Sequence, residues 1–169
     1  MAKEIDQKVY ADEVTEISAD LSPQIQEFID EDTVDHPADP YIVGADDELT
    51  PTLSVILPTL NEEKAIGDCI AQIKNAVATL EIPTEIIVSD NSDDHTPIIA
   101  RGLGAKVITP DEKGYGNAYQ YGFSAARGEY IAIGDADTTY DFEELPDLLN
   151  RAIEDSADLV IGSRFLGTI

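Results

Sequence analysis

The sequence has 169 residues, of which 43% are hydrophobic, and this is enough for one domain with a core of ordinary size. Asp and Glu number 35 against 10 Lys and Arg, which gives a net charge of −25 at pH 7. A charge this negative argues against a nucleic-acid-binding surface and against docking on anionic lipid through a basic patch. A ligand that carries phosphate therefore needs a local device, such as a metal ion, a helix N-terminus or a single Arg.

Residues 1–50 are predicted to form an acidic, largely disordered leader. They contain 15 acidic and 2 basic residues and no sustained hydrophobic period, so at most a short helix is expected over residues 23–29. Packed structure is expected to begin near Leu53. The excess of acidic residues continues through the rest of the chain, which indicates a surface adapted to high salt and a halophilic, archaeal source.

Residues 51–169 alternate between strand and helix patterns. Short apolar runs predict strands over residues 53–57, 85–88, 105–108, 130–133 and 158–161, with Pro58 ending the first. Apolar residues at helical spacing and helix-start signals predict helices over residues 65–80, 96–103, 113–126 and 142–154. Continuous apolar strands that alternate with helices predict an α/β fold, with a parallel sheet covered on both faces.

Polar clusters follow the predicted strands, at the edge where parallel sheets bind ligands. They span residues 58–62, 89–94, 113–117, 135–137 and 162–164. Asp135 and Asp137 flank one residue after a strand, so an extended chain places both side chains on one side. Two carboxylates there could hold Mg²⁺ or Mn²⁺ shared with a diphosphate, although such a pair is by itself a weak signal in so acidic a chain.

The loops after the first two strands offer acceptors for a nucleotide base. Asp90 could accept a hydrogen bond from a base N–H, and Asn61 or Glu62 could do the same from the first loop. Asp94 or Asn91 is expected to cap the helix that follows.

Two further features of the sequence are candidates for contacts with phosphate. Gly114 and Gly116 are followed by Gly122, a spacing that fails the dinucleotide fingerprint, so a nicotinamide dehydrogenase is disfavoured and a tight turn is the simpler role. Arg164 follows the predicted fifth strand, where its guanidinium could clamp a phosphate or pair with an acidic neighbour.

The remaining reactive side chains point to no separate site. His36 and His95 are expected to be solvated or to cap a helix, and Cys69 is expected to be a small core residue in a reducing compartment. The sequence has no apolar stretch of membrane-spanning length and no secretory signal, which indicates a cytoplasmic location.

In their order along the chain, the clusters resemble those of the family 2 glycosyltransferases with the GT-A fold, most closely the dolichyl-phosphate or undecaprenyl-phosphate sugar synthases. The resemblance covers residues 53–167. Its motifs are Val55-Ile56-Leu57-Pro58-Thr59-Leu60-Asn61-Glu62, Val88-Ser89-Asp90-Asn91-Ser92-Asp93-Asp94-His95-Thr96, Gly114-Tyr115-Gly116-Asn117-Ala118, Asp135-Ala136-Asp137 and Gly162-Ser163-Arg164-Phe165. Ser89 departs from the family's first Asp, and Asn91 and His95 replace glycines.

The resemblance implies a role for each matching position. The residues implied to bind the nucleotide-sugar are Pro58, Thr59, Leu60, Asn61, Glu62, Asp90, Gly114, Asn117 and Ala136. Asp135 and Asp137 are implied to hold Mg²⁺ or Mn²⁺, with Thr139 beside the metal. Asp137 and Arg164 are the implied catalytic residues, and Arg164 is expected to meet a phosphate of the acceptor.

The implied reaction is inverting transfer of a hexose from a UDP- or GDP-sugar to a polyprenyl phosphate at the cytoplasmic face of the membrane. A phosphate acceptor is already anionic, so the reaction requires no catalytic base, and stabilisation of the departing nucleoside diphosphate would supply most of the rate. Relatives continue beyond the position of Ile169, so we expect a truncated chain in which residues 51–169 form the donor-site domain.

Two other functions remain open on the sequence. A family 2 transferase could act on a glycan hydroxyl, in which case its carboxylate base would lie beyond Ile169. The chain could instead be a non-catalytic nucleotide-binding or interaction module, with the acidic leader as the partner surface.

Overall fold

The computed structural model describes residues 39–163, so the short helix expected over residues 23–29 lies outside the described part. The sheet has four strands in the order β3-β2-β1-β4, and every neighbouring pair is parallel. The strands are β1 (Leu53–Thr59), β2 (Thr84–Asp90), β3 (Lys106–Ile108) and β4 (Tyr130–Ile133). The predicted α/β class with a parallel sheet is confirmed.

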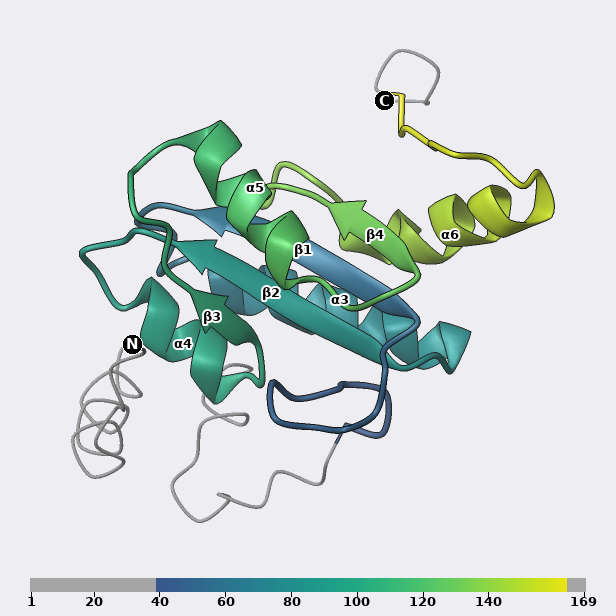
Figure 1. The fold of residues 1–169 in the computed structure, drawn as a ribbon, viewed down its shortest axis with the longest axis horizontal. Coiled ribbons are helices and arrows are strands. Elements are labelled where there is room, and N and C mark those ends of the chain that lie inside the picture. Colours follow the sequence, from purple (N-terminus) through teal and green to yellow (C-terminus); the bar gives the residue numbers. More distant parts are fainter. Residues whose placement is uncertain (1–38, 164–169) are drawn as a thin grey trace.

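Helices cover both faces of the sheet (Figure 1). The helix α3 (Ile66–Leu80) lies on one face and packs against α4 (Thr96–Gly102) and α6 (Leu145–Glu154). A short 3-10 helix, η1 (Phe142–Glu144), leads into α6. The helix α5 (Tyr115–Ala125) lies on the other face, over β1 and β2. Within residues 39–163 no helix is long and apolar enough to cross a membrane.

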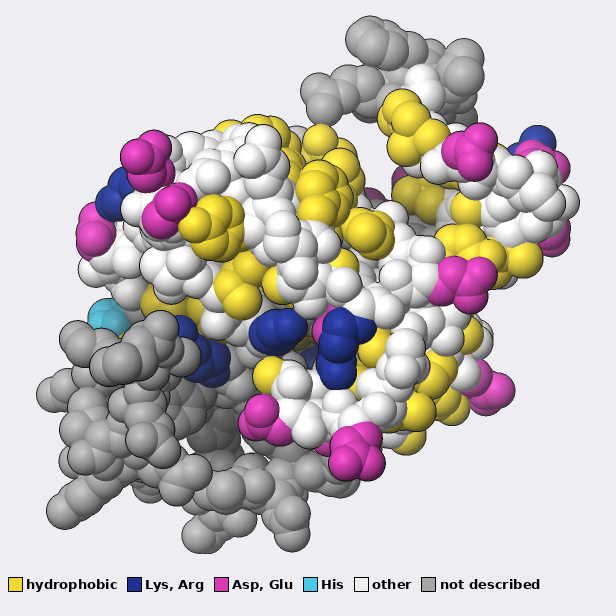
Figure 2. All heavy atoms as spheres, viewed as in Figure 1, with side chains coloured by type: hydrophobic (Ala, Val, Ile, Leu, Met, Phe, Trp, Pro, Cys, Tyr) yellow, Lys and Arg dark blue, Asp and Glu magenta, His cyan; other side chains and the backbone are white. Residues whose placement is uncertain are grey.

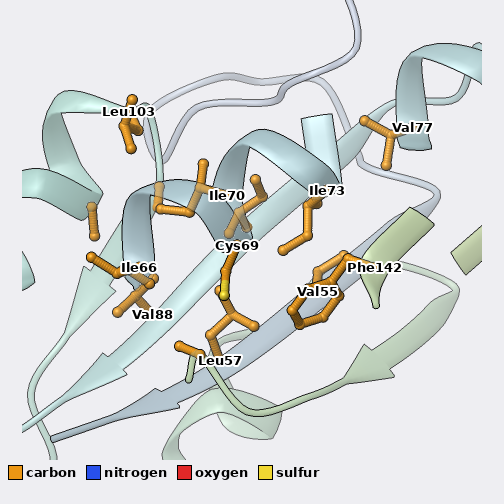
Figure 3. Packing of buried hydrophobic residues seen from close by; sticks show 14 of the residues in the cluster. Val55, Leu57, Ile66, Cys69, Ile70, Ile73, Val77, Val88, Leu103 and Phe142 are labelled. Atoms are coloured by element: carbon orange, nitrogen blue, oxygen red, sulfur yellow. The ribbon is translucent and has the colours of Figure 1, made fainter. Parts of the chain in front are cut away.

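The main core lies between the sheet and α3 (Figure 3). Val55 and Leu57 of β1 and Val88 of β2 belong to this buried cluster. The side chains that α3 contributes recur at helical spacing and are Ile66, Cys69, Ile70, Ile73, Ala76 and Val77. Full burial of an Ile or Leu side chain is worth about 1.5–3 kcal/mol, so this layer holds β1 and β2 firmly against α3.

The strand β1 continues through Pro58 to Thr59, two residues beyond the predicted end. Gly134 donates its N–H to the carbonyl of Ile56, which shows that the backbone N–H and C=O of Ile56 face β4. Because strand residues alternate, the backbone N and C=O of Pro58, two residues later, face the same side. The pairing of β1 with β4 ends at Ile56, so no ladder bond is lost to the missing N–H of Pro58. The interpretation of Pro58 as the end of the strand was therefore wrong.

The predicted fifth strand is also wrong. Residues 158–161 form no strand, and the side chains of Leu159 and Ile161 are 74% and 75% exposed. A short apolar run becomes a strand only where a neighbouring strand pairs with it, and within residues 39–163 β4 pairs with β1 alone. Residues 162–163, the described part of the last polar cluster, consequently do not follow a strand of this sheet.

Packed structure begins earlier than the expected start near Leu53. Val43 is buried and donates its N–H to the carbonyl of Thr84 at 2.8 Å, and Thr84 donates back to the carbonyl of Tyr41 at 2.7 Å. The predicted helix over residues 142–154 opens as η1, where Asp141 Oδ1 accepts the N–H of Glu143. The other predicted strands and helices agree with the structure to within two residues at each end.

Candidate functional site

A pocket of about 300 Å³ opens at the carboxyl ends of β1 and β4, where parallel sheets bind their ligands. Its walls come from the loops after β1, β2 and β4 and from the start of α5. The lining residues are Pro58, Thr59, Leu60, Glu62, Asn91, Lys113, Gly114, Tyr115, Ala118, Asp135, Ala136 and Asp137. The sequence-predicted residues among them are Pro58, Thr59, Leu60, Glu62, Gly114, Asp135, Ala136 and Asp137.

The loop after β4 concentrates negative charge on one wall of the pocket. Asp137 Oδ1 accepts the N–H of Thr139 at 2.9 Å, and hydrogen bonds from Thr139 hold the pKa of Asp137 below its usual value. Partial burial, and then the charge of Asp137, raise the pKa of Glu62. The charges of Asp94 and Asp135 add to the same shift. A cation bound in this pocket would relieve this repulsion.

Two tyrosines of α5 contact the carboxylate of Asp135. The Tyr115 hydroxyl donates to Asp135 Oδ1 at 2.8 Å, and the Tyr119 hydroxyl lies 3.4 Å from the same oxygen. The two rings meet edge to face with their centroids 5.0 Å apart. Burial, followed by the hydrogen bond with Tyr115, raises the pKa of Tyr119, so its hydroxyl keeps its proton at neutral pH.

The carboxylates of the pocket suit a divalent cation that is shared with a ligand. Within residues 39–163 no three His, Cys, Asp or Glu side chains converge as a ready-made metal cage. Asp135 and Asp137 nevertheless supply two oxygen donors beside an open pocket. Mg²⁺ is commonly held by one or two carboxylates, with phosphate oxygens and water completing the shell. The donor set therefore fits Mg²⁺ or the similar Mn²⁺ bound together with a phosphate-bearing ligand.

Hydrogen bonds join the loops that follow β1 and β2. Asn61 adopts a left-handed backbone with φ of 63°, donates its N–H to Ser92 Oγ at 2.7 Å and accepts the N–H of Asp93 on its side chain. Glu62 donates its N–H to Thr96 Oγ1 at 2.9 Å. Asn61, predicted to contact the nucleotide, therefore lies outside the pocket lining and holds the two loops together.

The start of α4 differs from the expected capping. The N-cap residue is His95, which makes no side-chain capping bond, so the N-cap role expected of Asp94 or Asn91 is wrong. Asp94, one residue earlier, accepts the N–H of Thr96 on Oδ1 at 3.0 Å. The His95 side chain is exposed, and its Nδ1 lies 3.0 Å from Glu63 Oε2.

Four other predicted site residues lie outside the pocket lining or outside the described chain. Asp90 is 3% exposed and accepts hydrogen bonds from Thr59 Oγ1 at 2.7 Å and from the Ser92 N–H at 3.1 Å. Asn117 donates to Asp111 Oδ1 and to the carbonyl of Glu112, and these bonds close the loop of residues 111–117 that contains Gly114, the glycine loop. Thr139 supports Asp137 through the hydrogen bond described above. Arg164 falls beyond residue 163, where the structure makes no statement.

Comparison with protein families gives a match to "Glycosyl transferase family 2" over residues 54–168, more than half of the chain. The chain belongs to glycosyl transferase family 2. A low-salt glycan biosynthesis hexosyltransferase, Agl6, of Haloferax volcanii is 52% identical over 136 residues, which cover 80% of this chain and 33% of that protein. A dolichyl-phosphate hexose transferase of the same organism is 39% identical, over 66% of this chain and 47% of that protein.

Solved structures give the same fold. A glucosyl-3-phosphoglycerate synthase of Mycobacterium tuberculosis, in complex with Mn²⁺, UDP and glucosyl-3-phosphoglycerate, is 30% identical with a TM-score of 0.51, over 59% of this chain and 39% of that chain. A mannosyl-3-phosphoglycerate synthase of Rubrobacter xylanophilus is 28% identical with a TM-score of 0.53, over 62% of this chain and 37% of that chain. These are GT-A glycosyltransferases, and the predicted GT-A fold is confirmed.

Four residues of this family 2 pocket were not among the predicted site residues: Asn91, Lys113, Tyr115 and Ala118. Lys113 brings a cation to the pocket rim, where its Nζ lies 2.9 Å from Asp93 Oδ2. Tyr115 lies between Gly114 and Gly116, and Tyr119 follows four residues later, a spacing that places both rings on one face of a helix. That spacing indicates that the two rings lie together, but it does not identify Asp135 as their partner.

A second hollow of the family 2 domain, about 570 Å³ in volume, lies between β4 and α6. Its lining is largely apolar and includes Phe123, Ile131, Ile133 and Leu159, each at least 46% exposed. Figure 2 shows apolar side chains gathered on this side of the molecule. The three acidic side chains of its lining, Glu129, Asp141 and Asp158, form no cluster with metal-binding geometry, so the first pocket is the candidate chemical site.

Proposed function

We propose that this chain is the donor-binding part of a metal-dependent, inverting glycosyltransferase. It moves a hexose from a UDP- or GDP-sugar to a polyprenyl phosphate. The observation that carries this proposal is the pocket at the strand ends, which is lined by Asp135 and Asp137 and by Gly114 at the start of α5. The synthase of Mycobacterium tuberculosis, which shares the fold at 30% identity, has been solved with Mn²⁺ and UDP, and this supports a nucleoside diphosphate and a divalent metal here.

The roles of the pocket residues follow from their positions. Asp135 and Asp137 hold Mg²⁺ or Mn²⁺, and Thr139 keeps Asp137 in place and ionised. The nucleotide-sugar lies against Pro58, Thr59, Leu60, Glu62, Gly114 and Ala136. Three further side chains support the pocket without contacting the ligand, because they hold the loops that form its walls: Asp90, Asn61 and Asn117.

The residue inventory suits an acceptor that needs no deprotonation. When bound, the metal ion would supply the positive charge that stabilises the departing nucleoside diphosphate. Lys113 lies at the rim and can leave Asp93 for a phosphate oxygen, because both side chains of that ion pair are more than half exposed. A phosphate acceptor attacks C1 of the hexose with its own anionic oxygen, and Arg164 would orient it.

The acceptor is inferred from the relatives. The similarity to the dolichyl-phosphate hexose transferase of Haloferax volcanii supports a polyprenyl phosphate as the acceptor. We therefore propose that the protein acts at the cytoplasmic face of the membrane.

The chain spans about a third of the length of Agl6 and about half of the length of that transferase. We further propose residues 1–50 as an acidic leader, residues 51–169 as the donor domain, and adaptation to high salt as the reason for the charge of −25.

Equilibrium dialysis against labelled UDP- and GDP-hexoses tests the proposal. We expect one donor to bind in Mg²⁺ or Mn²⁺ and to be released by a chelator. NADH serves as the control ligand and should not bind, because the glycine spacing fails the dinucleotide pattern. Absence of metal-dependent binding of both donors would overturn the enzyme proposal and leave the non-catalytic interaction module.

A further inference from the structure

We propose that Tyr115 and Tyr119 are positioning residues that hold Asp135 in the orientation in which it binds the metal ion. This inference rests on the proposed function, because it concerns the same site. It assigns a role to two side chains that the motif Asp135-Ala136-Asp137 does not contain. Both belong to α5, whereas Asp135 follows β4, so the interaction joins the glycine-loop side of the pocket to its acidic side.

The geometry directs two hydroxyl groups at one carboxylate oxygen. Tyr115 Oη lies 2.8 Å from Asp135 Oδ1 and Tyr119 Oη lies 3.4 Å from it, while the two hydroxyl oxygens are 3.5 Å apart. Hydrogen bonds of O–H groups to a carboxylate are among the stronger ones in proteins. Both tyrosines meet Oδ1, and no hydrogen bond to Oδ2 of Asp135 is formed within the described chain.

Ring contacts along α5 join the two tyrosines to each other and to Phe123. Tyr115 and Tyr119 are separated by one helical turn and meet edge to face, and Tyr119 stacks on Phe123 one turn further along, with centroids 5.9 Å apart. The helix itself lies close against β1, since a β-carbon at Gly122 would overlap with the side chain of Ile56. The glycine therefore lets α5 approach the sheet closely enough for its tyrosines to reach the end of β4.

This arrangement has a consequence for metal binding. With Oδ1 held by hydroxyl groups, Oδ2 of Asp135 would be available to a cation. A carboxylate held in one orientation would suit Mg²⁺, which demands a near-octahedral shell completed by phosphate oxygens and water. Groups that orient a metal-binding carboxylate in this way commonly change metal affinity by 10–100-fold when removed.

The test measures Mn²⁺ affinity of the full chain without any substrate, from the EPR signal of free Mn²⁺. We expect Tyr115→Phe and Tyr119→Phe each to weaken Mn²⁺ binding, with a loss of about tenfold for Tyr115→Phe. Tyr121→Phe is the matched control, because it makes the same change on the same helix while its hydroxyl bonds to Asp111. Melting temperatures of all three variants should stay close to the wild type, which separates positioning from a loss of structure.

The outcomes separate this inference from the proposed function. If the wild type binds Mn²⁺ and Asp137→Asn abolishes binding, yet Tyr115→Phe and Tyr119→Phe bind as tightly as Tyr121→Phe, the inference is overturned and the proposed function stands. If the wild type binds no Mn²⁺, the metal-dependent function itself fails. Tyr115 is 62% exposed, so Tyr115→Phe is expected to fold even if Tyr119→Phe does not.

Discussion

The hydroxyl of Thr59 donates a 2.7 Å hydrogen bond to Asp90, and this bond joins the carboxyl ends of β1 and β2. Both residues are buried, at 6% and 3% exposure, and they stand opposite each other in the register of the two strands. Ser92 adds its N–H and hydroxyl to the same carboxylate. The floor of the candidate site is therefore held by a buried carboxylate that lies outside the pocket lining.

Replacing Thr59 with Val should destabilise the fold. The variant keeps the shape of the side chain and removes a hydrogen bond to a buried charge, which is worth about 1.5–3 kcal/mol. Urea denaturation of wild type and variant measures this difference. Thr79→Val is the control, because the Thr79 hydroxyl bonds only to a carbonyl of its own helix and the expected change is about 0.5 kcal/mol or less. An equal loss in the free energy of unfolding for the two variants would contradict a stabilising role of the Thr59–Asp90 hydrogen bond.

Gly122→Ala should also destabilise the protein. A β-carbon at this position overlaps with Ile56, so α5 must move away from β1, and such overpacking typically costs about 1–3 kcal/mol. Gly116→Ala, in the same helix, is the matched control, because no atom lies within 4 Å of its added carbon. The control should be neutral or up to about 1 kcal/mol more stable through helix propensity. The melting temperature should therefore fall for Gly122→Ala and stay the same or rise for Gly116→Ala. Equal melting temperatures of the two variants would contradict the close contact between Gly122 and Ile56.

The buried ion pair at the opposite end of the sheet should give a pH-dependent contribution to stability. Arg127 Nε lies 3.0 Å from Glu85 Oε2, and the Glu85 side chain is 1% exposed. Burial acts to raise the pKa of Glu85, but hydrogen bonds from Ser54 and Arg127, with the guanidinium charge, outweigh it and lower the pKa. The stability that Glu85 provides is therefore present above its unfolded pKa of about 4.3 and is lost as pH falls through the folded pKa.

Arg127→Met leaves a buried carboxylate without its cation and should cost about 3 kcal/mol at pH 7. The difference from the wild type should shrink as the pH falls from 5 toward 3, because protonated Glu85 no longer needs the guanidinium. Arg151→Met, which breaks an exposed pair with Asp155, should cost about 0.5 kcal/mol or less. A penalty for Arg127→Met that stays constant with pH would contradict this account.

Glu62→Gln should stabilise the metal-free protein. Partial burial, and then the charges of Asp137, Asp94 and Asp135, raise the pKa of Glu62. Because Glu62 is partly exposed, the gain is about 0.5 kcal/mol, and it should fade as added salt screens the repulsion. Thermal melts in a chelator at low and high salt measure it. A lower melting temperature for Glu62→Gln at low salt would contradict the repulsion.

Local patterns were enough to predict much of the fold. The continuous apolar runs of β2 and β4 and the helical spacing of α3 depend on the sequence near each element, and the structure confirms them. Residues 158–161 have the same apolar character and form no strand, because strand formation depends on a pairing neighbour that the run itself does not specify. The prediction that Pro58 ends β1 was wrong for the same reason. A strand can contain proline where no neighbouring strand needs its N–H, and this depends on where β4 ends.

The candidate site divides in the same way. Asp135, Asp137 and Gly114 were predictable because short motifs mark them next to strand and helix ends, and all three line the pocket. Tyr115 was missed because its contact with Asp135 joins residues 20 positions apart. That contact depends on how closely α5 approaches β1, which is set by Gly122, and no local pattern encodes this distance.

Metal-dependent donor binding, measured for the wild type, Asp137→Asn and Asp147→Asn, tests whether the pocket binds a nucleotide-sugar through a metal ion. Both variants remove one negative charge, but Asp147 is exposed in the first turn of α6, outside the pocket lining. Isothermal titration with UDP- and GDP-hexoses, with Mn²⁺ or with a chelator, reports binding without requiring an acceptor. We predict that the wild type and Asp147→Asn bind one donor only with metal, and that Asp137→Asn loses this binding. Equal metal-dependent binding by all three proteins would contradict the assignment of Asp137 and the site proposed around it.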